Sequence, residues 1–525
     1  MQNQTPPDKP SGSAGDAPGG TSSASISHQG ATTLSSSATL DSPNYSSTTG
    51  GENALLVTDG EITLETPVVT KTGDESSENS DFYGTNAAVL TTGGSLIITG
   101  GSITTKGSHA NALFAYGESS ITATNTQITT TGNNSGGIMV TGGGAITASG
   151  LIVETSGNSS APIRSDRGGG GIAVNGGSYT SNGVGSPAIY STAIISVNNA
   201  TLVSNKSEGV VIEGSNSVSL SNGTTLTATN TTLNGNSETY KNIFIYQSMS
   251  GDAEEGTGNF AASDSTITTN AGDTFYITNT TAKISLANNK IINNDASSVF
   301  LRAEGAKWGT SGANGGDVSL LLSQQVVEGD IVLDNISTLE LDLTQSYYMG
   351  AINAANTAKS VSVTLDTDSN LILAGDTYLT QLTNADTTNQ NIYSNGYKLY
   401  VSGEEVAVNG SEAPEAPEIV ITAETTTDAV ETIDVSATEC ANGSVFTECS
   451  GQVKTPIIIA GVALVVIIVA VIAFVIYNKK KKTPKAPENP GGTVLPSEPP
   501  ASAAPTSTAT PPDSPVQPEP PAPTA

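Results

Sequence analysis

A repeat of 25 residues runs through the middle of this 525-residue chain and limits the folds that it can adopt. From Asn86, three successive units align without a gap, namely NAAVLTTGGSLIITGGSITTKGSHA, NALFAYGESSITATNTQITTTGNNS and GGIMVTGGGAITASGLIVETSGNSS. Each unit has apolar residues at its third, eleventh and eighteenth positions and a glycine at its twenty-second. These columns are Ala88, Leu113 and Ile138; Leu96, Ile121 and Ile146; Ile103, Ile128 and Val153; and Gly107, Gly132 and Gly157.

Each apolar position lies in a short stretch, such as SITAT or QITTT, that alternates as a β-strand does. A unit of three short strands is too short for a propeller blade and has no helix for a helical repeat. The repeat therefore predicts an all-β fold, a parallel β-helix over residues 51–402, with successive coils about 4.8 Å apart. The later segments DVSLLL, DIVLD, TLELDL, SVSVTL and NLILAG continue it less regularly. A stacked β-sandwich is the alternative fold, but it would not explain three gapless units.

The repeat also predicts which side chains face outward. If the third position points into the coil, strand alternation turns the fourth position out. This fourth column consists of Val89, Phe114, Met139, Arg164, Tyr190, Ile212, Ile245, Ile277 and Arg302. An outer face that is this apolar, interrupted by arginines and a tyrosine, is typical of a binding strip. The alternative is that a loop or capping segment covers the column and that the arginines pair with Asp166 and Glu304.

The composition excludes several classes of protein. The chain has 56 glycines, only 13% charged residues and a single Trp, which does not fit a helical bundle or an ordinary α/β enzyme. A formal net charge of -30 also argues against a nucleic-acid partner, because such proteins need clustered Lys and Arg to displace counterions from phosphates.

One apolar run predicts a membrane anchor. Residues 457–477 (IIIAGVALVVIIVAVIAFVIY) carry no charge and would span about 30 Å as a helix, so residues 456–478 are expected to cross a membrane once. Lys479 to Lys482 and Lys485 follow this run directly, which places the Pro-rich tail, residues 479–525, in the cytoplasm. The part of the chain before the run is then extracellular.

The flanks of the repeat array are expected to be unstructured. Residues 1–50 are rich in Ser, Thr, Gly and Pro and are predicted to be disordered. They show no signal peptide, so we expect either a start further upstream or targeting by the membrane segment. Residues 403–455 read as an acidic stalk, and its Cys440 and Cys449, the only cysteines, are predicted to form a disulfide outside the cell. No metal site is expected at the cysteines, because neither His28 nor His109 lies near them.

The candidate ligand-binding residues are Arg164, Asp166, Arg167, Tyr190, Arg302 and Trp308. The first three lie together in APIRSDRGGGG, and Trp308 follows Arg302 closely. No arrangement of Ser or Cys with His and Asp indicates catalysis, and His109 is interpreted as an exposed turn residue. Asp252, Glu254 and Glu255 in SGDAEEG could hold Ca²⁺ with oxygen ligands, the alternative being an acidic surface loop; no other cofactor is expected.

The repeats from 86 to 302 resemble a known family. Their motifs NSSAPIRSDRGGGG, GSPAIYST, SEGVVIEGSNSVSL and IYQSMSGDA are similar to those of bacterial adhesin-like cell-surface proteins with a right-handed parallel β-helix of the pectate-lyase-like superfamily. The resemblance implies the architecture but does not select an activity, because the scaffold serves lyases, hydrolases and plain adhesins alike. Lyases of this fold use carboxylate-bound Ca²⁺ and a basic residue, and Arg167 beside Asp166 is the only candidate for that arrangement.

These observations predict a single-pass cell-surface protein, expected to be a monomer, that binds an extracellular glycan or another cell without catalysis. Scarce Trp and His argue against a tight sugar-processing cleft. An extracellular polysaccharide lyase or glycosidase centred on Arg164, Asp166 and Arg167 is the alternative from the enzyme class. A passive surface layer or spacer is the third hypothesis.

Overall fold

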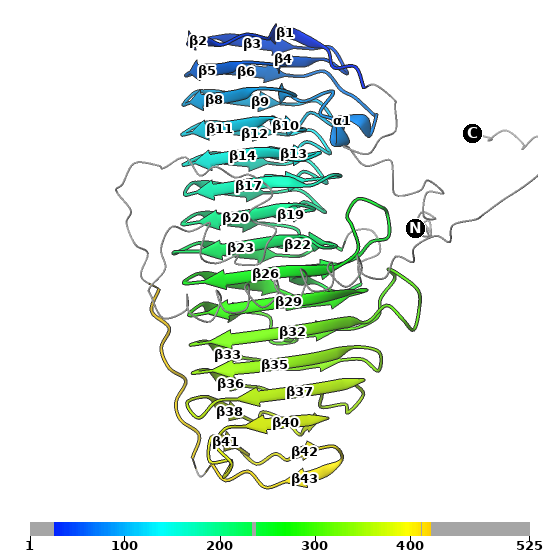
Figure 1. Cartoon of the computed structure of the whole chain (residues 1–525), viewed down its shortest axis with the longest axis vertical. Coiled ribbons are helices and arrows are strands. Elements are labelled where there is room, and N and C mark those ends of the chain that lie inside the picture. Colours follow the sequence, from blue (N-terminus) through cyan, green and yellow to red (C-terminus); the bar gives the residue numbers. More distant parts are fainter. Residues whose placement is uncertain (1–25, 234–237, 411, 422–525) are drawn as a thin grey trace, which may run out of the picture. The chain divides into compact units, whose positions relative to one another are not determined.

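The chain folds into a parallel β-solenoid whose strands recur side by side in chain order (Figure 1). The computed structural model describes residues 26–233, 238–410 and 412–421. Strand partners in consecutive coils lie 25 residues apart where the repeat is gapless, as for Ile103, Ile128 and Val153. All pairs are parallel except the last, which closes the C-terminal end of the solenoid. The prediction of an all-β parallel solenoid is therefore confirmed.

Three long sheets form the sides of the solenoid, and each takes one strand from most coils. Sheet A has 12 strands: β1 (Gly30–Leu34), β4 (Asn53–Val57), β7 (Val89–Thr91), β10 (Leu113–Tyr116), β13 (Ile138–Thr141), β16 (Ile163–Ser165), β19 (Ile189–Ser191), β22 (Val210–Glu213), β25 (Lys241–Tyr246), β28 (Asp273–Thr278), β31 (Leu301–Ala303) and β34 (Ile331–Leu333).

Sheet B has 14 strands: β2 (Ala38–Asp41), β5 (Glu61–Glu65), β8 (Ser95–Thr99), β11 (Ser120–Thr124), β14 (Gly144–Ser149), β17 (Gly170–Asn175), β20 (Ile194–Asn198), β23 (Ser217–Ser221), β26 (Thr257–Ser263), β29 (Thr280–Ala287), β32 (Gly316–Ser323), β35 (Thr338–Thr344), β37 (Ser360–Leu365) and β40 (Gln381–Asn384). Its later strands β32, β35 and β37 confirm the prediction that the array continues beyond the regular repeats.

Sheet C has 10 strands: β3 (Asn44–Ser47), β6 (Val68–Lys71), β9 (Ser102–Thr105), β12 (Gln127–Thr130), β15 (Ile152–Thr155), β18 (Ser178–Ser181), β21 (Thr201–Ser204), β24 (Thr225–Thr229), β27 (Thr266–Ala271) and β30 (Lys290–Asn293). In the last coils two small sheets follow. They consist of β33 (Val326–Glu328), β36 (Tyr347–Met349), β38 (Asn370–Ile372) and β41 (Ile392–Tyr393), and of β39 (Thr377–Leu379), β42 (Leu399–Val401) and β43 (Glu404–Val406).

The core is a continuous apolar column inside the coils. Inward side chains such as Leu96, Ile121 and Ile146 stack on one another and are fully buried, as the repeat predicts. Their strand neighbours face outward and are mostly Thr and Ser, because alternate residues of a strand point to opposite faces. Each coil thus contributes a few apolar residues from each sheet to one shared core.

Two kinds of corner residue make the tight turns between sheets. At the corner from sheet B to sheet C, one or two residues adopt positive φ, for example Asn125 at 52° and Gly150 at 63°; Asn and Gly tolerate this region best. At the corner from sheet C to sheet A the glycines stack directly. A Cβ at Gly132 would lie 1.9 Å from the Gly107 carbonyl oxygen, which explains the glycine at the twenty-second position.

Two predicted boundaries change. The prediction of disorder for residues 1–50 is wrong for the described part of that segment, because β1, β2 and β3 form the first coil. This terminal coil packs against a neighbouring coil on one side only. Its inward side chains are therefore only half-buried, and small residues are enough to make that contact. At the other end, β43 extends the solenoid beyond residue 402 into the predicted stalk.

The remaining predictions for the termini fall outside the described residues. These are the rest of the stalk with its Cys440–Cys449 disulfide, the membrane-crossing segment 456–478 and the tail 479–525. Within the described ranges, the structure has no helix that is long and apolar enough to span a membrane.

Candidate functional site

The outer face of sheet A carries loop insertions in addition to the regular coils of the solenoid. Long loop segments fold over it, three of which lie wholly within the described residues, whereas short corners join most other strands (Figure 1). The first is segment 74–86, which precedes β7 and contains the short helix α1 (Asn79–Phe82). The second, 247–256, follows β25, and the third, 304–315, follows β31. The chain takes 34 residues from Val69 to its strand partner Ile103, so the first insertion lengthens its coil.

The strand pairing corrects the predicted outward column. The side chains that stack outward along sheet A are Leu56, Leu90, Phe114, Met139, Arg164, Tyr190, Val211, Phe244, Tyr276 and Arg302. Val89, Ile212, Ile245 and Ile277, which were expected in this column, point into the core instead. The alignment slips by one residue in these coils because both faces of the strands are apolar, so alternation gives no signal.

The outward column is covered rather than exposed. Leu90, Phe114 and Met139 are fully buried in a small apolar cluster with Ala87, which directly follows the 74–86 insertion. Val211, Phe244 and Tyr276 form a second cluster against Tyr246 and Trp308. The alternative considered above, that loops cover the column and the arginines pair with acidic residues, is therefore what the structure shows.

Arg164 and Asp166 lie at the centre of a buried ionic cluster. Arg164 Nη2 is 3.2 Å from Asp166 Oδ2, and its Nη1 is 3.3 Å from Oδ1 of Asp81 on α1. His109 Nδ1 contacts the other Asp81 oxygen at 2.7 Å, and Asn134 Nδ2 lies 3.0 Å from His109 Nε2. His109 is thus not the exposed turn residue predicted from the sequence, because α1 packs against it. We call Asp81, His109, Arg164 and Asp166 the clasp.

Burial and charge shift the protonation of the clasp. Burial raises the pKa of Asp166 to about 7, against the opposing effect of the Arg164 guanidinium. The hydrogen bond to Asp81 raises the pKa of His109, with burial opposing it. Asp166 therefore changes charge near neutral pH, and the raised pKa of His109 means that its imidazole keeps its proton to a higher pH than an ordinary histidine does.

A second polar cluster centres on Glu213, at the end of β22. Its Oε2 accepts hydrogen bonds from the hydroxyls of Tyr190 (2.7 Å) and Tyr246 (3.0 Å), and its Oε1 accepts one from Ser248. Only 1% of Glu213 is exposed, and desolvation raises its pKa in spite of these donors. Arg167 joins the two clusters: its Nε donates to Asp252 Oδ1 at 2.6 Å, and its guanidinium lies 3.8 Å from the ring centre of Phe82.

An aromatic group lies next to Glu213 along the stack. Phe244 and Tyr246 stack with ring centres 4.3 Å apart, and Trp308 packs edge-on against Tyr246 at 5.3 Å. Tyr246 and Trp308 both keep part of their surface exposed. Arg302 is one coil beyond Tyr276, where its Nε pairs with Asp273 Oδ2 at 2.6 Å and its Nη1 is 4.0 Å from Glu304.

The predicted site residues thus fall into two groups. Arg164, Asp166, Arg167 and Tyr190 lie together, whereas Arg302 and Trp308 belong to the other end of the covered face, with Arg302 five coils from Arg164, about 24 Å at the usual strand spacing. The proposed Ca²⁺ ligands do not converge: Asp252 pairs with Arg167, and Glu254 and Glu255 are exposed. Among the described residues, no group of three or more His, Cys, Asp or Glu could hold a metal ion.

The sequence does not identify Asp81, Glu213 or Tyr246 as residues of this site. The sequence signal for Asp81 was the extra length of its coil: residues 72–85 do not align with any part of the 25-residue repeat. Glu213 gave no usable signal, because the slipped alignment puts Gly214 at the position of Asp166, and only the strand pairing of the structure makes Glu213 its equivalent two coils on.

Comparisons of the chain with protein-family models, with curated proteins and with solved structures found no match.

Proposed function

We propose that this chain is a non-catalytic, glycan-binding protein of the cell surface, anchored by the apolar run at 457–477. The resemblance of its motifs to right-handed β-helix adhesins of the pectate-lyase-like superfamily is supported by the three-sided parallel solenoid. In this proposal, a solenoid of stacked coils carries the binding face away from the membrane.

One observation carries the proposal: three insertions converge on the outer face of a single sheet, where they assemble aromatic and polar side chains. Tyr246 and Trp308 are part-exposed rings that contact each other, and the residues that follow them in the chain, Gln247 and Gly309, line an open hollow of about 420 Å³. Binding sites for small ligands combine apolar or aromatic walls with a few well-placed polar groups. Tyr and Trp suit a sugar, since they offer a flat apolar face and a polar atom.

The test is a glycan array probed with the full-length chain and with Trp308→Ala. Removing a central aromatic anchor is expected to weaken binding at least about 10-fold. Tyr397→Ala is the matched control, because Tyr397 is 43% exposed in the last coils and far along the chain from the insertions. If the wild-type chain binds no glycan on the array, the proposal is wrong and a passive surface layer becomes the better explanation.

A glycan-cleaving enzyme is the second candidate, favoured by the two buried carboxyls with raised pKa values. Asp166 and Glu213 occupy equivalent register positions two coils apart, so their backbones are about 10 Å from each other. Inverting glycosidases hold two carboxyls roughly 6.5–9.5 Å apart. Only 6% of Asp166 and 1% of Glu213 are exposed, however, which favours a structural role. New reducing ends or unsaturated sugars, formed by wild type but not by Asp166→Asn, would support the enzyme.

A further inference from the structure

The N-terminal end of the solenoid presents open strand edges. β1, β2 and β3 are the first strands of sheets A, B and C, and no described strand pairs with them on the side away from the second coil. The Ser42 N–H, the Pro43 oxygen and the Ser47 oxygen bond to the second coil. Because alternate residues of a strand turn their backbone groups to opposite sides, the residues of β2 and β3 that face the free side are Thr39, Asp41, Asn44 and Ser46. Such an edge is a template for a further strand.

The path of the chain leads away from this open end. His28 Nε2 lies 2.9 Å from Tyr83 O, and the His28 ring is 5.7 Å from the ring of Tyr116 on β10. β10 is three coils beyond β1 in sheet A. The chain therefore reaches Gly30 along the outer face of sheet A, beside segment 74–86, and not across the end. Residues 1–25 join the described chain on that side.

The opposite end of the solenoid is closed by its own chain. β43 folds back antiparallel on β42, and the Gly410 N–H donates to Ile392 O of β41 at 3.0 Å. This end also carries charge, since Glu404 and Glu405 lie in β43 and Lys398 Nζ is 2.8 Å from Glu405 Oε2. Charged side chains and a covering segment are the usual protection of a sheet edge. Among the described residues, the N-terminal end has neither of them.

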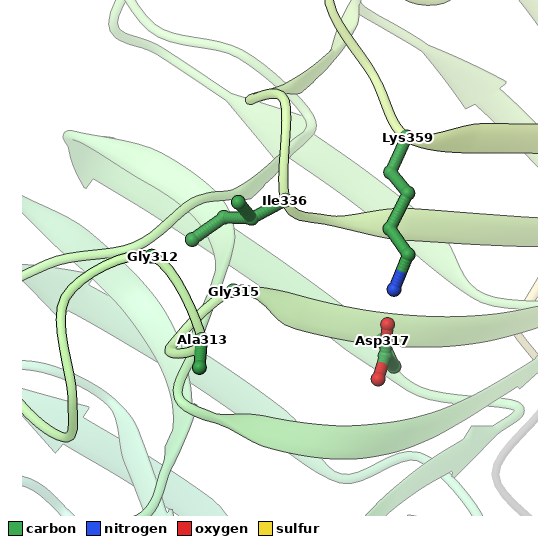
Figure 2. Close-up of a pocket in the computed structure, with 6 residues that line it drawn as sticks. All are labelled: Gly312, Ala313, Gly315, Asp317, Ile336 and Lys359. Carbon is green, nitrogen blue, oxygen red and sulfur yellow. The ribbon is translucent and has the colours of Figure 1, made fainter.

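The first coil is also nearly free of charge. Later coils carry charges of both signs, and Figure 2 shows the Lys359 side chain pointing toward Asp317 on β32. Between residues 26 and 50, Asp41 is the single acidic residue, and there is no Lys or Arg. The strands GATTL, ATLD and NYSS contain no proline either. In a chain with a net charge of -30, two copies meet with least repulsion at this coil.

From these observations we propose that the open end is a docking surface for a second copy of this chain, with the two first coils joined head to head by antiparallel strand pairing. The coil rises from β1 through β2 to β3, so β2 lies at the mean height of the end. A twofold axis through β2 therefore brings β2 opposite its own copy and β1 opposite β3 of the second copy. The closed C-terminal end prevents further addition, so the assembly stops at a dimer. The inference is independent of glycan binding.

The free backbone groups fix the register of this pairing. When Thr39 of one copy and Asp41 of the other exchange backbone hydrogen bonds, Leu40 lies opposite Leu40 of the second copy. Pairing of β1 with β3 of the second copy likewise brings Leu34 next to Tyr45 of that copy. Leu34 and Leu40 point inward and are half-buried against the core in the single chain. The dimer thus covers them by continuing the coil-to-coil packing of the solenoid.

The first test measures the mass of the purified full-length chain in detergent by sedimentation equilibrium over a range of concentrations. Wild type should dimerise. Thr39→Pro removes an N–H that faces the free side and leaves the bonds to β5 intact. It should therefore weaken dimerisation at least about 10-fold without lowering the unfolding temperature. Thr39→Val, which keeps the N–H, is the matched control and should dimerise as wild type does.

The second test probes the register by cross-linking, in a chain that also carries Cys440→Ser and Cys449→Ser. Leu40→Cys should give a disulfide-linked dimer on oxidation, because Cα atoms of a directly opposite, non-hydrogen-bonded pair are about 4.5 Å apart. Ala38→Cys changes the other inward residue of β2 and serves as the control. The two copies of residue 38 are four residues apart along the strands, about 14 Å, so this variant should not form the disulfide.

Three results would overturn the proposal. The first is a wild-type chain that stays monomeric at every concentration. The second is a chain that dimerises only after deletion of residues 1–25, since that segment would then be the occupant of the end. The third is a dimer that survives Thr39→Pro, or that is linked through Ala38→Cys and not through Leu40→Cys, because the two copies would then meet through other residues.

Discussion

Asp166 shows how one side chain of the covered face responds to its surroundings. It is shielded from water by the insertions, it faces the Arg164 guanidinium at 3.2 Å, and it accepts a hydrogen bond from the backbone N–H of Arg167 at 2.9 Å. These partners favour the ionised form, but burial outweighs them and raises the pKa to about 7. The folded chain therefore holds a proton on Asp166 at pH values where the unfolded chain has released it.

That proton gives the first prediction, a fall in stability between about pH 4 and pH 7. In this window the folded state binds one more proton at Asp166 than the unfolded state, so the free energy of unfolding decreases as pH rises, with a slope of at most about 1.4 kcal/mol per pH unit. Asp166→Asn should flatten the profile measured by urea unfolding. Glu254→Gln, at an exposed loop position, should leave the profile as it is. A wild-type profile that rises through this window would contradict the assignment.

The residues of the site show what a sequence can and cannot predict. Leu96, Ile121 and Ile146 could be assigned to the core because they repeat every 25 residues in strands that alternate. Ile212 and Ile245 could not be placed correctly, because their strands are apolar on both faces once a loop covers the outer one. The clasp could not be predicted for another reason. Asp81 and Arg164 are 83 residues apart in the sequence, and they meet only because an insertion folds across several coils.

Among the elements, segment 74–86 is attached to the solenoid by a few specific contacts. Asp81 bridges His109 and Arg164, Phe82 O accepts a hydrogen bond from Thr141 Oγ1 at 2.7 Å, and Gly84 lies so close to Phe114 that a Cβ would meet its ring at 3.0 Å. A segment held by a charged bridge, a few hydrogen bonds and a small apolar contact can open without unfolding the sheet beneath it.

The second prediction is that this segment opens more readily as pH rises from 6 to 8. The bond to Asp81 raises the pKa of His109, so the stabilisation it provides is fully present below the unfolded pKa of about 6.5 and is lost as pH rises through the folded pKa. The charged neighbours of His109 are Asp81, Arg164 and Glu75. Hydrogen exchange of amides 74–86, corrected for intrinsic rates, should be faster at pH 8.

Two controls accompany this measurement. His109→Gln should remove the pH difference in segment 74–86, because a neutral side chain replaces the titrating one. Amides of β12, in the sheet that the insertion does not touch, should stay protected at both pH values. Equal protection of segment 74–86 at pH 6 and pH 8 in the wild-type chain would show that His109 does not hold it.

On the scale of the whole molecule, the solenoid is a stack in which each coil contacts mainly its two neighbours. Leu113 pairs with Val89 on one side and with Ile138 on the other, and the same relation holds for the strands of sheets B and C in these coils. The stability of such an array is approximately a sum of coil and interface contributions. Removal of one complete coil should therefore leave each remaining strand paired in register with a neighbouring strand of the same sheet.

This relation yields the last prediction, which compares a complete coil with half of one. Deleting residues 111–135 joins Ala110 to Gly136, and Ile138 then takes the place of Leu113 beside Val89 with its side chain still inward. The variant should be soluble, with the β-sheet circular dichroism of the parent. Its unfolding midpoint should fall by a few degrees, because Arg164 moves one coil closer and no longer meets Asp81. Deleting residues 117–129 instead removes β11 and most of β12 and leaves too few residues for a turn, so that variant should not fold. Equal behaviour of the two deletions would mean that the coils do not stack as independent units.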